Sequence, residues 1–352
     1  MPLPDGHHRI LIATDAWEPQ VNGVVRTLTA LTQELRAMGH VVEIVGPDRF
    51  WTIPCPTYPD IALSLFPARR LVRMIRDFKP DVLHIATEGP IGMAARTWAR
   101  RSGLDFTTAF HTRFAEYIQA RTGMPVRPIY AWMRRFHAAG QGMLVATRSM
   151  REELDTRGFH HIRPWTRGVD LTLFQPEPRA VWDFPRPVFL HVGRIAVEKN
   201  IGAFLELELP GSKVVVGGGP ALAGLRRRHP DVHFLGPRYG TELAQCYAAA
   251  DAFVFPSLTD TFGLVLLEAL ACGTPIAAFP VTGPIDVLAD APTLVGAVDW
   301  NLRDAALKAL DANRADCRSY AETFPWRTCA EVFMSHLVPL AKSGWSEPTR
   351  AR

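Results

Sequence analysis

Two acids eight positions apart, Asp260 and Glu268, stand in the almost entirely apolar stretch SLTDTFGLVLLEALACGTP, residues 257–275. The pattern predicts a loop that carries Asp260, followed by a helix over residues 262–272. Asp260 has an ordinary interpretation as a helix-capping acid, whereas Glu268 inside the apolar helix would be a costly buried charge without a partner. Gly263, in the first helical turn, would let a ligand approach free backbone N–H groups.

Two cations follow a predicted strand in the segment HVGRIAVEKNI. Gly193-Arg194 ends the strand, and Lys199 comes five residues later, just before a predicted helix. Arg offers a planar fork and Lys a point charge, so the pair suits a diphosphate. Two solvated surface charges are an equally good interpretation of this spacing.

Two further strand ends carry candidate ligand groups. His111, in AFHTRF, could bind a sugar hydroxyl or carry a proton, or it could be a hydrogen-bonded structural residue. Gly23, in DAWEPQVNGVVRTL, stands between a strand and a helix, where the backbone can approach an anionic ligand, although a simple tight turn is the commoner case. The chain has no GxGxxG fingerprint, which argues against NAD or FAD.

Short apolar runs that alternate with amphipathic ones must position these groups. This alternation predicts an α/β fold with two Rossmann-like parallel sheets facing a cleft, with ligands at the carboxyl ends of the strands. The first set of predicted strands spans residues 9–15, 41–48, 81–87, 106–112 and 142–148, and the second spans 187–195, 212–220, 232–237 and 251–257. We predict an N-terminal acceptor domain over residues 1–170, a Pro-rich linker over 171–186, a donor domain over 187–325 and an amphipathic C-terminal helix within 326–352.

The composition excludes several classes of protein. The net charge of +4 over 352 residues is too small and too evenly spread to favour a nucleic-acid partner. The 5 cysteines have no paired spacing, which favours reduced thiols over disulfides or a zinc site. The N-terminus lacks the apolar core of a signal peptide, and no apolar run approaches the ~20 residues of a membrane span. We expect a cytoplasmic protein, either free or peripheral on the inner face of the cytoplasmic membrane.

Two basic stretches are candidates for an acceptor or membrane surface. They are LFPARRLVRMIRDFKP, residues 65–80, and MPVRPIYAWMRRFHAAG, residues 124–140. Basic amphipathic helices with aromatic residues can lie on anionic membranes. The alternative is a helix packed on its domain with Arg facing water. The second stretch contributes Tyr130, Trp132, Arg134 and Arg135 to the predicted surface.

Taken together, these segments resemble the retaining glycosyltransferases of family 4, which have the GT-B fold. The Gly-containing first loop, the His of FHT, GR with a Lys five residues on, GGGP (residues 217–220) and TFGLVLLEALACGTPIAA occur in the family's order over essentially the whole chain. The family's hallmark is a Glu, seven residues and a second Glu. Here the second Glu is Glu268, but Asp260 stands at the first position, a departure that bears on the donor-sugar contacts.

The resemblance implies that the C-terminal helix within residues 326–352 crosses back to cover the first domain. It also implies roles for individual residues. Glu268 would grip the nucleotide ribose, and Asp260 would reach the hexose hydroxyls with a side chain one methylene shorter than Glu. His111 would lie beside the sugar at the reacting centre, and Gly23 would approach the donor or the acceptor. The diphosphate would be held by the charges of Arg194 and Lys199 and by N–H groups at Phe262, Gly263, Leu264 and Val265.

The predicted function is transfer of a hexose from a nucleotide diphosphate sugar to a hydroxyl acceptor, with retention of configuration. UDP-glucose, UDP-glucuronate and GDP-mannose remain candidate donors, and diacylglycerol is the type of membrane-lipid acceptor that we favour. Fixed cations and a helix N-terminus can stabilise the departing diphosphate, so no metal or other cofactor is expected. The alternatives are a non-hydrolysing nucleotide-sugar epimerase of the same fold, a transferase acting on a soluble or polysaccharide glycan acceptor, and a nucleotide-sugar-binding protein without turnover.

Overall fold

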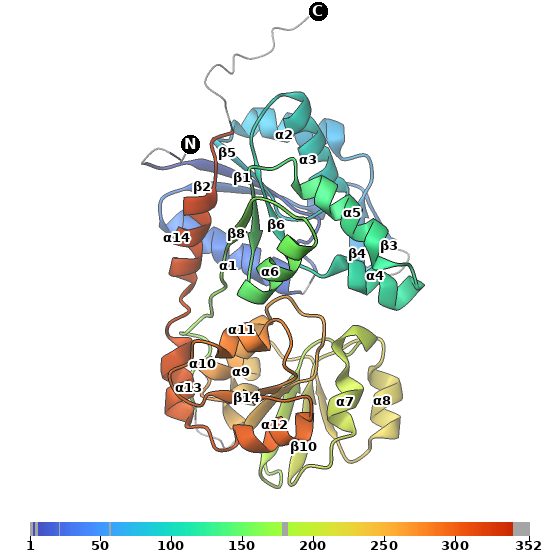
Figure 1. Ribbon diagram of the computed structural model, residues 1–352, viewed down its shortest axis with the longest axis vertical. Helices are drawn as coiled ribbons and strands as arrows, with labels where there is room; N and C mark the ends of the chain where they lie inside the picture. Colours follow the sequence, from blue (N-terminus) through green and yellow to red (C-terminus); the bar gives the residue numbers. More distant parts are fainter. Residues whose placement is uncertain (1–2, 4–5, 21, 56–57, 178–181, 341–352) are drawn as a thin grey trace, which may run out of the picture. The chain divides into compact units, whose positions relative to one another are not determined.

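The computed structural model describes residues 3, 6–20, 22–55, 58–177 and 182–340. The chain forms two compact units, one made of Met1–Thr166 with Cys329–Arg352 and the other of Arg167–Thr328 (Figure 1). The described part of the predicted linker belongs to the second unit: Phe174 is buried with its ring against Tyr247, and its carbonyl accepts a hydrogen bond from Arg318. Residues 178–181 of that linker, and 341–352 of the predicted C-terminal segment, lie outside the described residues.

The first unit is built on a six-stranded parallel sheet in the order β2-β1-β5-β6-β7-β8. Strands β1, β5, β6 and β7 are nearly continuous apolar runs because helices cover both faces of a parallel sheet. The strands are β1 (Arg9–Ala13), β2 (Val41–Val45), β5 (Val82–Ile85), β6 (Thr107–Phe110), β7 (Gly142–Val145) and β8 (Ile162–Pro164). The helices are α1 (Gly23–Ala37), α2 (Ala68–Phe78), α3 (Pro90–Arg101), α4 (Phe114–Thr122), α5 (Val126–His137) and α6 (Arg148–Thr156).

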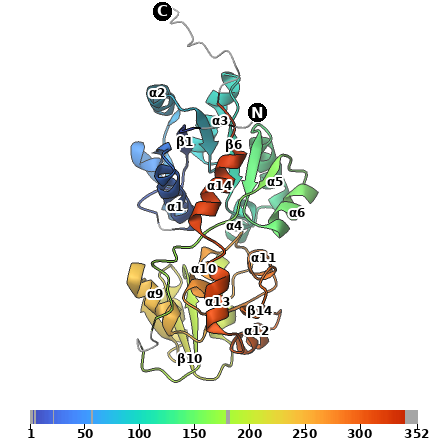
Figure 2. The ribbon, with the colours of Figure 1, turned by 90° about the vertical axis from the view of Figure 1, so that its left-hand side faces the viewer.

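Two further elements complete this unit. An antiparallel hairpin, β3 (Thr52–Cys55) and β4 (Tyr58–Ser64), was not predicted. The last helix, α14 (Trp326–His336), begins in the second unit and joins the first from Cys329 onward. Figure 2 shows α14 lying across the first unit, where Phe333 packs on the ring of His84 and the Cys329 carbonyl accepts a hydrogen bond from the Trp165 indole.

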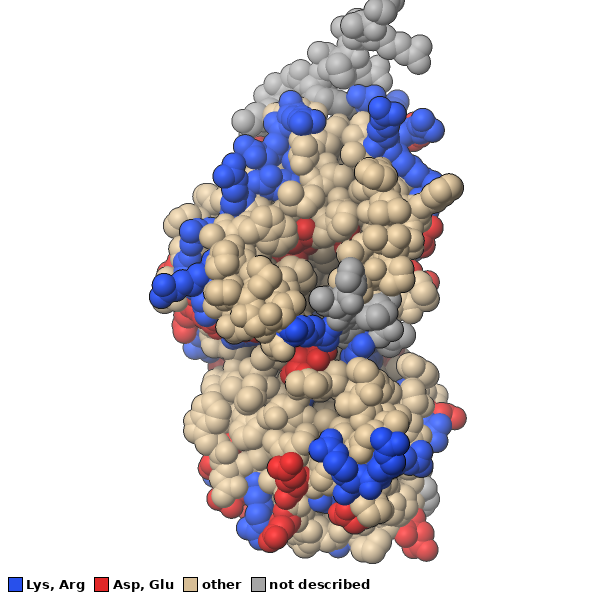
Figure 3. Space-filling view, turned by 90° about the vertical axis from the view of Figure 1, so that its right-hand side faces the viewer, with Lys and Arg blue, Asp and Glu red and all other residues tan. Residues whose placement is uncertain are grey.

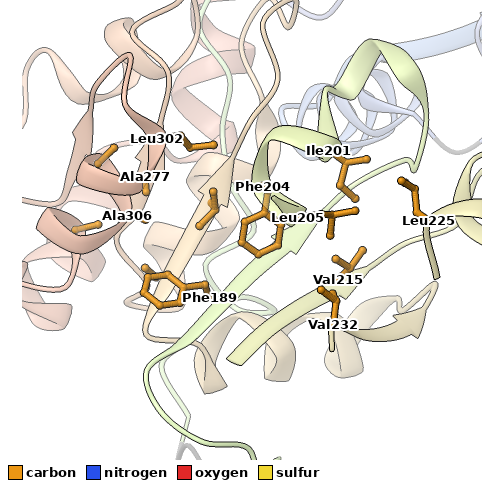
Figure 4. Packing of buried hydrophobic residues seen from close by; sticks show 14 of the residues in the cluster. Phe189, Ile201, Phe204, Leu205, Val215, Leu225, Val232, Ala277, Leu302 and Ala306 are labelled. Atoms are coloured by element: carbon orange, nitrogen blue, oxygen red, sulfur yellow. The ribbon is translucent and has the colours of Figure 1, made fainter. Parts of the chain in front are cut away.

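The second unit repeats the same architecture with the sheet order β11-β10-β9-β12-β13-β14. Its core places Phe189, Phe204 and Val215 between the sheet and the surrounding helices (Figure 4). The strands are β9 (Val188–Val192), β10 (Ser212–Val216), β11 (His233–Gly236), β12 (Ala252–Phe255), β13 (Ile276–Ala278) and β14 (Gly296–Val298). The helices are α7 (Ile201–Leu205), α8 (Leu222–Arg228), α9 (Gly240–Ala249), α10 (Leu264–Ala271), α11 (Pro284–Leu288), α12 (Leu302–Ala309) and α13 (Arg314–Ala321).

Each sheet has one point where the chain changes its direction of winding. In the first unit, the chain leaves β1 for β2 on one side, and β5 then lies on the other side of β1. In the second unit, the corresponding neighbours are β9 and β12. Ligands of open α/β sheets bind at the carboxyl ends of the strands at such switch points. The sheet order therefore singles out the segments that follow β1, β5, β9 and β12.

Candidate functional site

The switch point of the second unit gathers three of the predicted charged residues. Arg194 follows β9, and Lys199 ends a short 3-10 turn, Val197–Lys199, on the same loop. Asp260 comes from the loop after β12, and its Oδ1 accepts a hydrogen bond from Lys199 Nζ at 2.5 Å. The structure thus brings together an acid and a base that lie 61 positions apart in the sequence.

The charge of Asp260 is set by this contact. Burial by itself raises the pKa of the carboxyl, but the adjacent Lys199 ammonium outweighs burial and holds the pKa below its ordinary value. Asp260 is therefore an ionised carboxylate at neutral pH. Its second oxygen, Oδ2, is buried, and a hydrogen bond from the Ser257 hydroxyl also lowers the pKa of the carboxyl.

The helix after Asp260 begins later than the sequence predicts. Phe262 and Gly263 precede the helix, which starts at Leu264, because Gly263 has a left-handed backbone with φ of 84°. A residue with a side chain would be strained in this conformation, so glycine is needed for the turn itself. Gly263, the residue before α10, has no side chain that could cap the helix. Leu264 and Val265 are partly exposed in its first turn, and Phe262 is buried.

Glu268 lies inside the unit, 3% exposed, in the apolar helix α10. A buried carboxylate needs a partner, and the Tyr247 hydroxyl of α9 donates a hydrogen bond to its Oε2 at 3.0 Å. Tyr247 was not among the predicted site residues, because nothing in the sequence indicates that a tyrosine of the preceding helix contacts this acid.

A buried histidine lies in β9, the strand that leads to the same switch point. His191, in β9, hydrogen-bonds through Nδ1 to the Val254 carbonyl at 3.1 Å, so Nδ1 carries the proton. Burial lowers the pKa of His191 to about 4, and the ring is neutral at pH 7. His191 was not among the predicted site residues, because its position in an apolar strand resembles that of any core histidine.

The switch point of the first unit is acidic instead. Asp15 follows β1 and caps α3, accepting hydrogen bonds from the N–H groups of Ile91 (2.8 Å) and Gly92 (3.2 Å) and from the Thr87 hydroxyl (2.9 Å). Gly89 makes room for it, since a Cβ there would lie 2.5 Å from the Asp15 carboxyl carbon. Burial raises the pKa of Asp15 to about 6 against the effect of these hydrogen bonds.

A second acid of this switch point, Glu88, pairs with a buried histidine. Glu88 Oε1 lies 3.1 Å from His137 Nε2, and His137 Nδ1 lies 2.9 Å from the Thr108 hydroxyl. His137 is 3% exposed, at the end of α5. Glu88 was not among the predicted site residues. It comes just after a predicted strand, as the other candidates do, and this position is the sequence signal that could have identified it.

The predicted residues Gly23 and His111 lie at the same edge of the sheet. Gly23 begins α1 at an exposed position, and a Cβ there would meet no atom within 4 Å. The N–H groups of Val24 and Val25, in the first turn of α1, donate hydrogen bonds to the Asn22 side chain, both at 3.0 Å. His111 follows β6, and its ring packs edge-on against Trp165.

Comparison with known proteins identifies the family. The sequence model for Glycosyltransferase Family 4 matches residues 21–173, and that for Glycosyl transferases group 1 matches residues 186–311. A GDP-mannose-dependent alpha-mannosyltransferase of Mycobacterium tuberculosis (strain CDC 1551 / Oshkosh) is 32% identical over 80% of this chain and 81% of its own. The chain belongs to glycosyltransferase family 4. This confirms the predicted family and sets aside the epimerase alternative.

A second sequence relative and a solved structure are consistent with this family. The alpha-monoglucosyldiacylglycerol synthase of Streptococcus pneumoniae (strain ATCC BAA-255 / R6) is 27% identical over 86% of this chain and 78% of its own. Sucrose-phosphate synthase from Thermosynechococcus elongatus superposes with a TM-score of 0.67 at 21% identity, covering 92% and 96% of the two chains. The predicted GT-B fold is confirmed, and the enzyme is a nucleotide-sugar-dependent hexosyltransferase.

The prediction that Tyr130 belongs to the exposed surface of the transferase is wrong. Tyr130 is 4% exposed: its hydroxyl donates to Glu116 at 2.7 Å, and Arg157 lies over its ring at 4.2 Å. It belongs to the buried stripe of α5 and cannot contact a membrane or an acceptor. Trp132, Arg134 and Arg135 of α5 are exposed, and Arg134, one turn after Tyr130, donates a hydrogen bond to the Arg157 carbonyl at 2.9 Å.

Within the described part of the transferase, no group of three or more His, Cys, Asp or Glu side chains is arranged to hold a metal ion.

Proposed function

We propose that this hexosyltransferase moves a hexose from a UDP- or GDP-sugar to a hydroxyl group of a membrane lipid such as diacylglycerol, with retention of configuration. The observation that carries the donor half is the meeting of Arg194, Lys199 and the start of α10 at one switch point. Two cations and a helix start that follows a glycine form an environment for a diphosphate.

Each donor-site residue has a role that its geometry permits. A lysine ammonium has three protons, so Lys199 can hold Asp260 and a phosphate oxygen at the same time. The ionised Asp260 carboxylate would accept a hydrogen bond from a hexose hydroxyl. Glu268, which Tyr247 orients through one oxygen, would accept hydrogen bonds from the ribose hydroxyls.

The same charges assist bond breaking. Cleavage of the bond between the sugar and the phosphate leaves negative charge on the departing nucleotide diphosphate and positive charge on the sugar. Arg194, Lys199 and the N–H groups from Phe262 to Val265 stabilise the departing charge. The ionised Asp260 would contact the hexose, and His111 is the second catalytic residue of this proposal.

The lipid acceptor is supported by a relative whose name specifies a glucosylated diacylglycerol and by the surface of the first unit. On the face that carries α4, α5 and the hairpin, Lys and Arg side chains lie around a broad area of other residues (Figure 3). Trp132 and Phe114 are exposed there, 38% and 41%, with their rings 6.4 Å apart. Exposed aromatic residues beside cations are typical of proteins that lie on anionic membranes.

A second exposed corner extends this surface. Trp51 and Phe66 are 85% and 94% exposed, and the N–H of Leu65 donates to the Trp51 carbonyl, so the two aromatic residues lie at the same end of the β3–β4 hairpin. The basic helix α2, with Arg69 and Arg73 exposed, begins two residues later. No described helix is long and apolar enough to cross a bilayer. We therefore propose peripheral binding.

The test is a panel of radiolabelled UDP-glucose, UDP-glucuronate and GDP-mannose, each incubated with the enzyme and vesicles that contain diacylglycerol. The expected result is one labelled glycolipid whose glycosidic bond has the configuration of the donor. A labelled product found only with soluble glycans would contradict the lipid acceptor. Nucleotide binding without any product would contradict both halves of the proposal.

A further inference from the structure

We propose that Glu88 binds an acceptor hydroxyl at the switch point of the first unit, that His137 positions it, and that the acceptor's reacting end is a neutral polyol without a phosphate. This inference rests on the proposed function and adds the chemical class of the acceptor and the residue that selects it. The argument uses the position of Glu88, its anchoring and the charge of its surroundings.

Glu88 stands where the topology favours a ligand. It follows β5, the neighbour of β1 at the point where the winding changes direction. Its side chain is 16% exposed, so part of the carboxylate reaches the surface at this edge of the sheet. His111, expected beside the reacting sugar, follows β6, which is the next strand of the same sheet.

The carboxylate is held in one orientation. Among the described residues, its hydrogen bond is made by Oε1 alone, to His137 Nε2. The His137 ring cannot turn away because Thr108 holds its Nδ1 and the rings of Phe110, Phe136 and Phe159 pack around it. The second oxygen, Oε2, remains as an acceptor atom. An acceptor-only atom on a fixed carboxylate suits a hydroxyl donor.

The same place is unsuitable for a phosphate. Both helices that begin here have their first N–H groups bound by the chain itself, α3 by Asp15 and α1 by Asn22. Glu88 and Asp15 would also repel an anion.

The cations at this edge are already engaged. Arg113 binds Glu153 at 2.6 Å, and Arg26 and Arg148 also have interaction partners within the protein. An uncharged glycerol or sugar hydroxyl therefore fits this edge better than a phosphorylated headgroup.

The test measures transfer to three acceptors: phosphatidylcholine vesicles containing dioleoylglycerol, the same vesicles containing phosphatidylinositol instead, and soluble methyl glucoside. The donor is the radiolabelled sugar nucleotide with the highest affinity for the enzyme. We expect transfer to dioleoylglycerol and at least tenfold less to phosphatidylinositol. A preference for phosphatidylinositol would overturn the neutral class.

Glu88→Gln, which keeps the shape but weakens the acceptor atom, should raise the KM for dioleoylglycerol about tenfold and leave the KM for the donor unchanged. Glu152→Gln, an exposed acid on α6, is the matched control and should change neither value. Should Glu88→Gln lower the melting temperature by more than a few degrees, Glu88→Asp, which keeps the charge but shortens the reach, is measured in the same way. Unchanged acceptor KM in the folded variant would overturn the role of Glu88.

The outcomes separate this inference from the proposed function. Transfer to dioleoylglycerol with no effect of Glu88 leaves the proposed function standing and removes this inference. Transfer to methyl glucoside alone removes the lipid acceptor, and the Glu88 variants are then read with that acceptor. Donor binding with no transfer to any of the three removes both.

Discussion

The two switch points share an architecture but differ in charge. In the second unit, Gly263, which has no side chain, precedes α10, and Arg194 and the Lys199–Asp260 pair come from the loops of the same switch point. In the first unit, the side chains of Asp15 and Asn22 cap α3 and α1, and Glu88 adds a second acid. We infer that a helix start beside cations suits an anion, and that a helix start capped by the chain's own side chains beside acids suits a hydroxyl.

The largest effect is expected where the comparison predicts an anion. Arg194→Ala should lower kcat by about 100- to 1000-fold, because the departing diphosphate loses a charged donor in its transition state. Arg227→Ala, an exposed cation on α8 of the same unit, is the control and should leave kcat within about twofold. Steady-state transfer kinetics measure both. Similar losses in the two variants would mean that the total charge of the unit, and not the switch point, binds the donor.

The pH dependence of stability should have opposite signs in the two units. The folded-state pKa of Asp15 is raised from 3.8 to about 6, so its contribution to the free energy of unfolding falls as pH rises from about 4 to 6. The pKa of His191 is lowered from 6.5 to about 4, so its contribution rises between about pH 4 and 6.5. Each change is worth about 3 kcal/mol.

Urea unfolding between pH 4 and 7 measures these slopes. Asp15→Asn should make stability rise more steeply with pH than in the wild type, because the opposing His191 contribution remains. His191→Gln should make it fall more steeply. Variants with the same slope would contradict the opposite protonation chemistry of the two switch points.

Asp260 tests whether the acid of the donor site acts on the sugar or on the nucleotide. Asp260→Ala should lower kcat by about 100-fold, since the hexose loses a charged contact in the transition state, while nucleotide affinity stays the same or rises because Lys199 loses its partner. Calorimetric titration with UDP and GDP, beside transfer assays, separates the two effects. Asp260→Asn, which keeps the size and removes the charge, is the matched control. A parallel loss of nucleotide affinity would assign Asp260 to the nucleotide.

Glu268→Gln should weaken nucleotide binding by about tenfold, because a carboxylate that accepts ribose hydroxyls is replaced by a weaker acceptor. Tyr247→Phe is the comparison, since it removes the hydroxyl that orients Glu268 and should weaken binding less. Calorimetry gives both dissociation constants. Unchanged affinity for both UDP and GDP in Glu268→Gln would refute the ribose role.

The smallest effect concerns the outer surface of the first unit. Replacing Arg134 and Arg135 with Ser should lower binding to anionic vesicles several-fold, because each arginine near a charged surface contributes up to about 1 kcal/mol. Replacing Arg226 and Arg227 of the second unit with Ser should have no effect. Co-sedimentation with phosphatidylglycerol vesicles measures this. Equal losses in the two double variants would remove the assignment of membrane binding to the first unit.

Local sequence patterns were enough for the main features of the transferase. Continuous apolar strands and amphipathic helices recur along the chain, so the two parallel sheets could be predicted, although β3, β4, β8, β13 and β14 were not recognised. Arg194, Lys199 and Glu268 could be selected because their types and spacing are unusual beside apolar segments. The stripe of α5 also has helical spacing, at Ile129, Tyr130, Met133 and Phe136, and that spacing argued for a buried Tyr130.

Which side chains from distant parts of the chain contact each other could be determined only from the tertiary structure. The pairs Lys199–Asp260, Tyr247–Glu268 and Glu88–His137 join residues 61, 21 and 49 positions apart. A sequence pattern reports burial and periodicity, which are local, whereas the charge and orientation of a side chain depend on what the fold places within about 3 Å of it. The sequence by itself therefore determined a two-sheet glycosyltransferase with a cationic donor segment. Only the fold decided that Lys199 pairs with Asp260 at one switch point and Glu88 with His137 at the other.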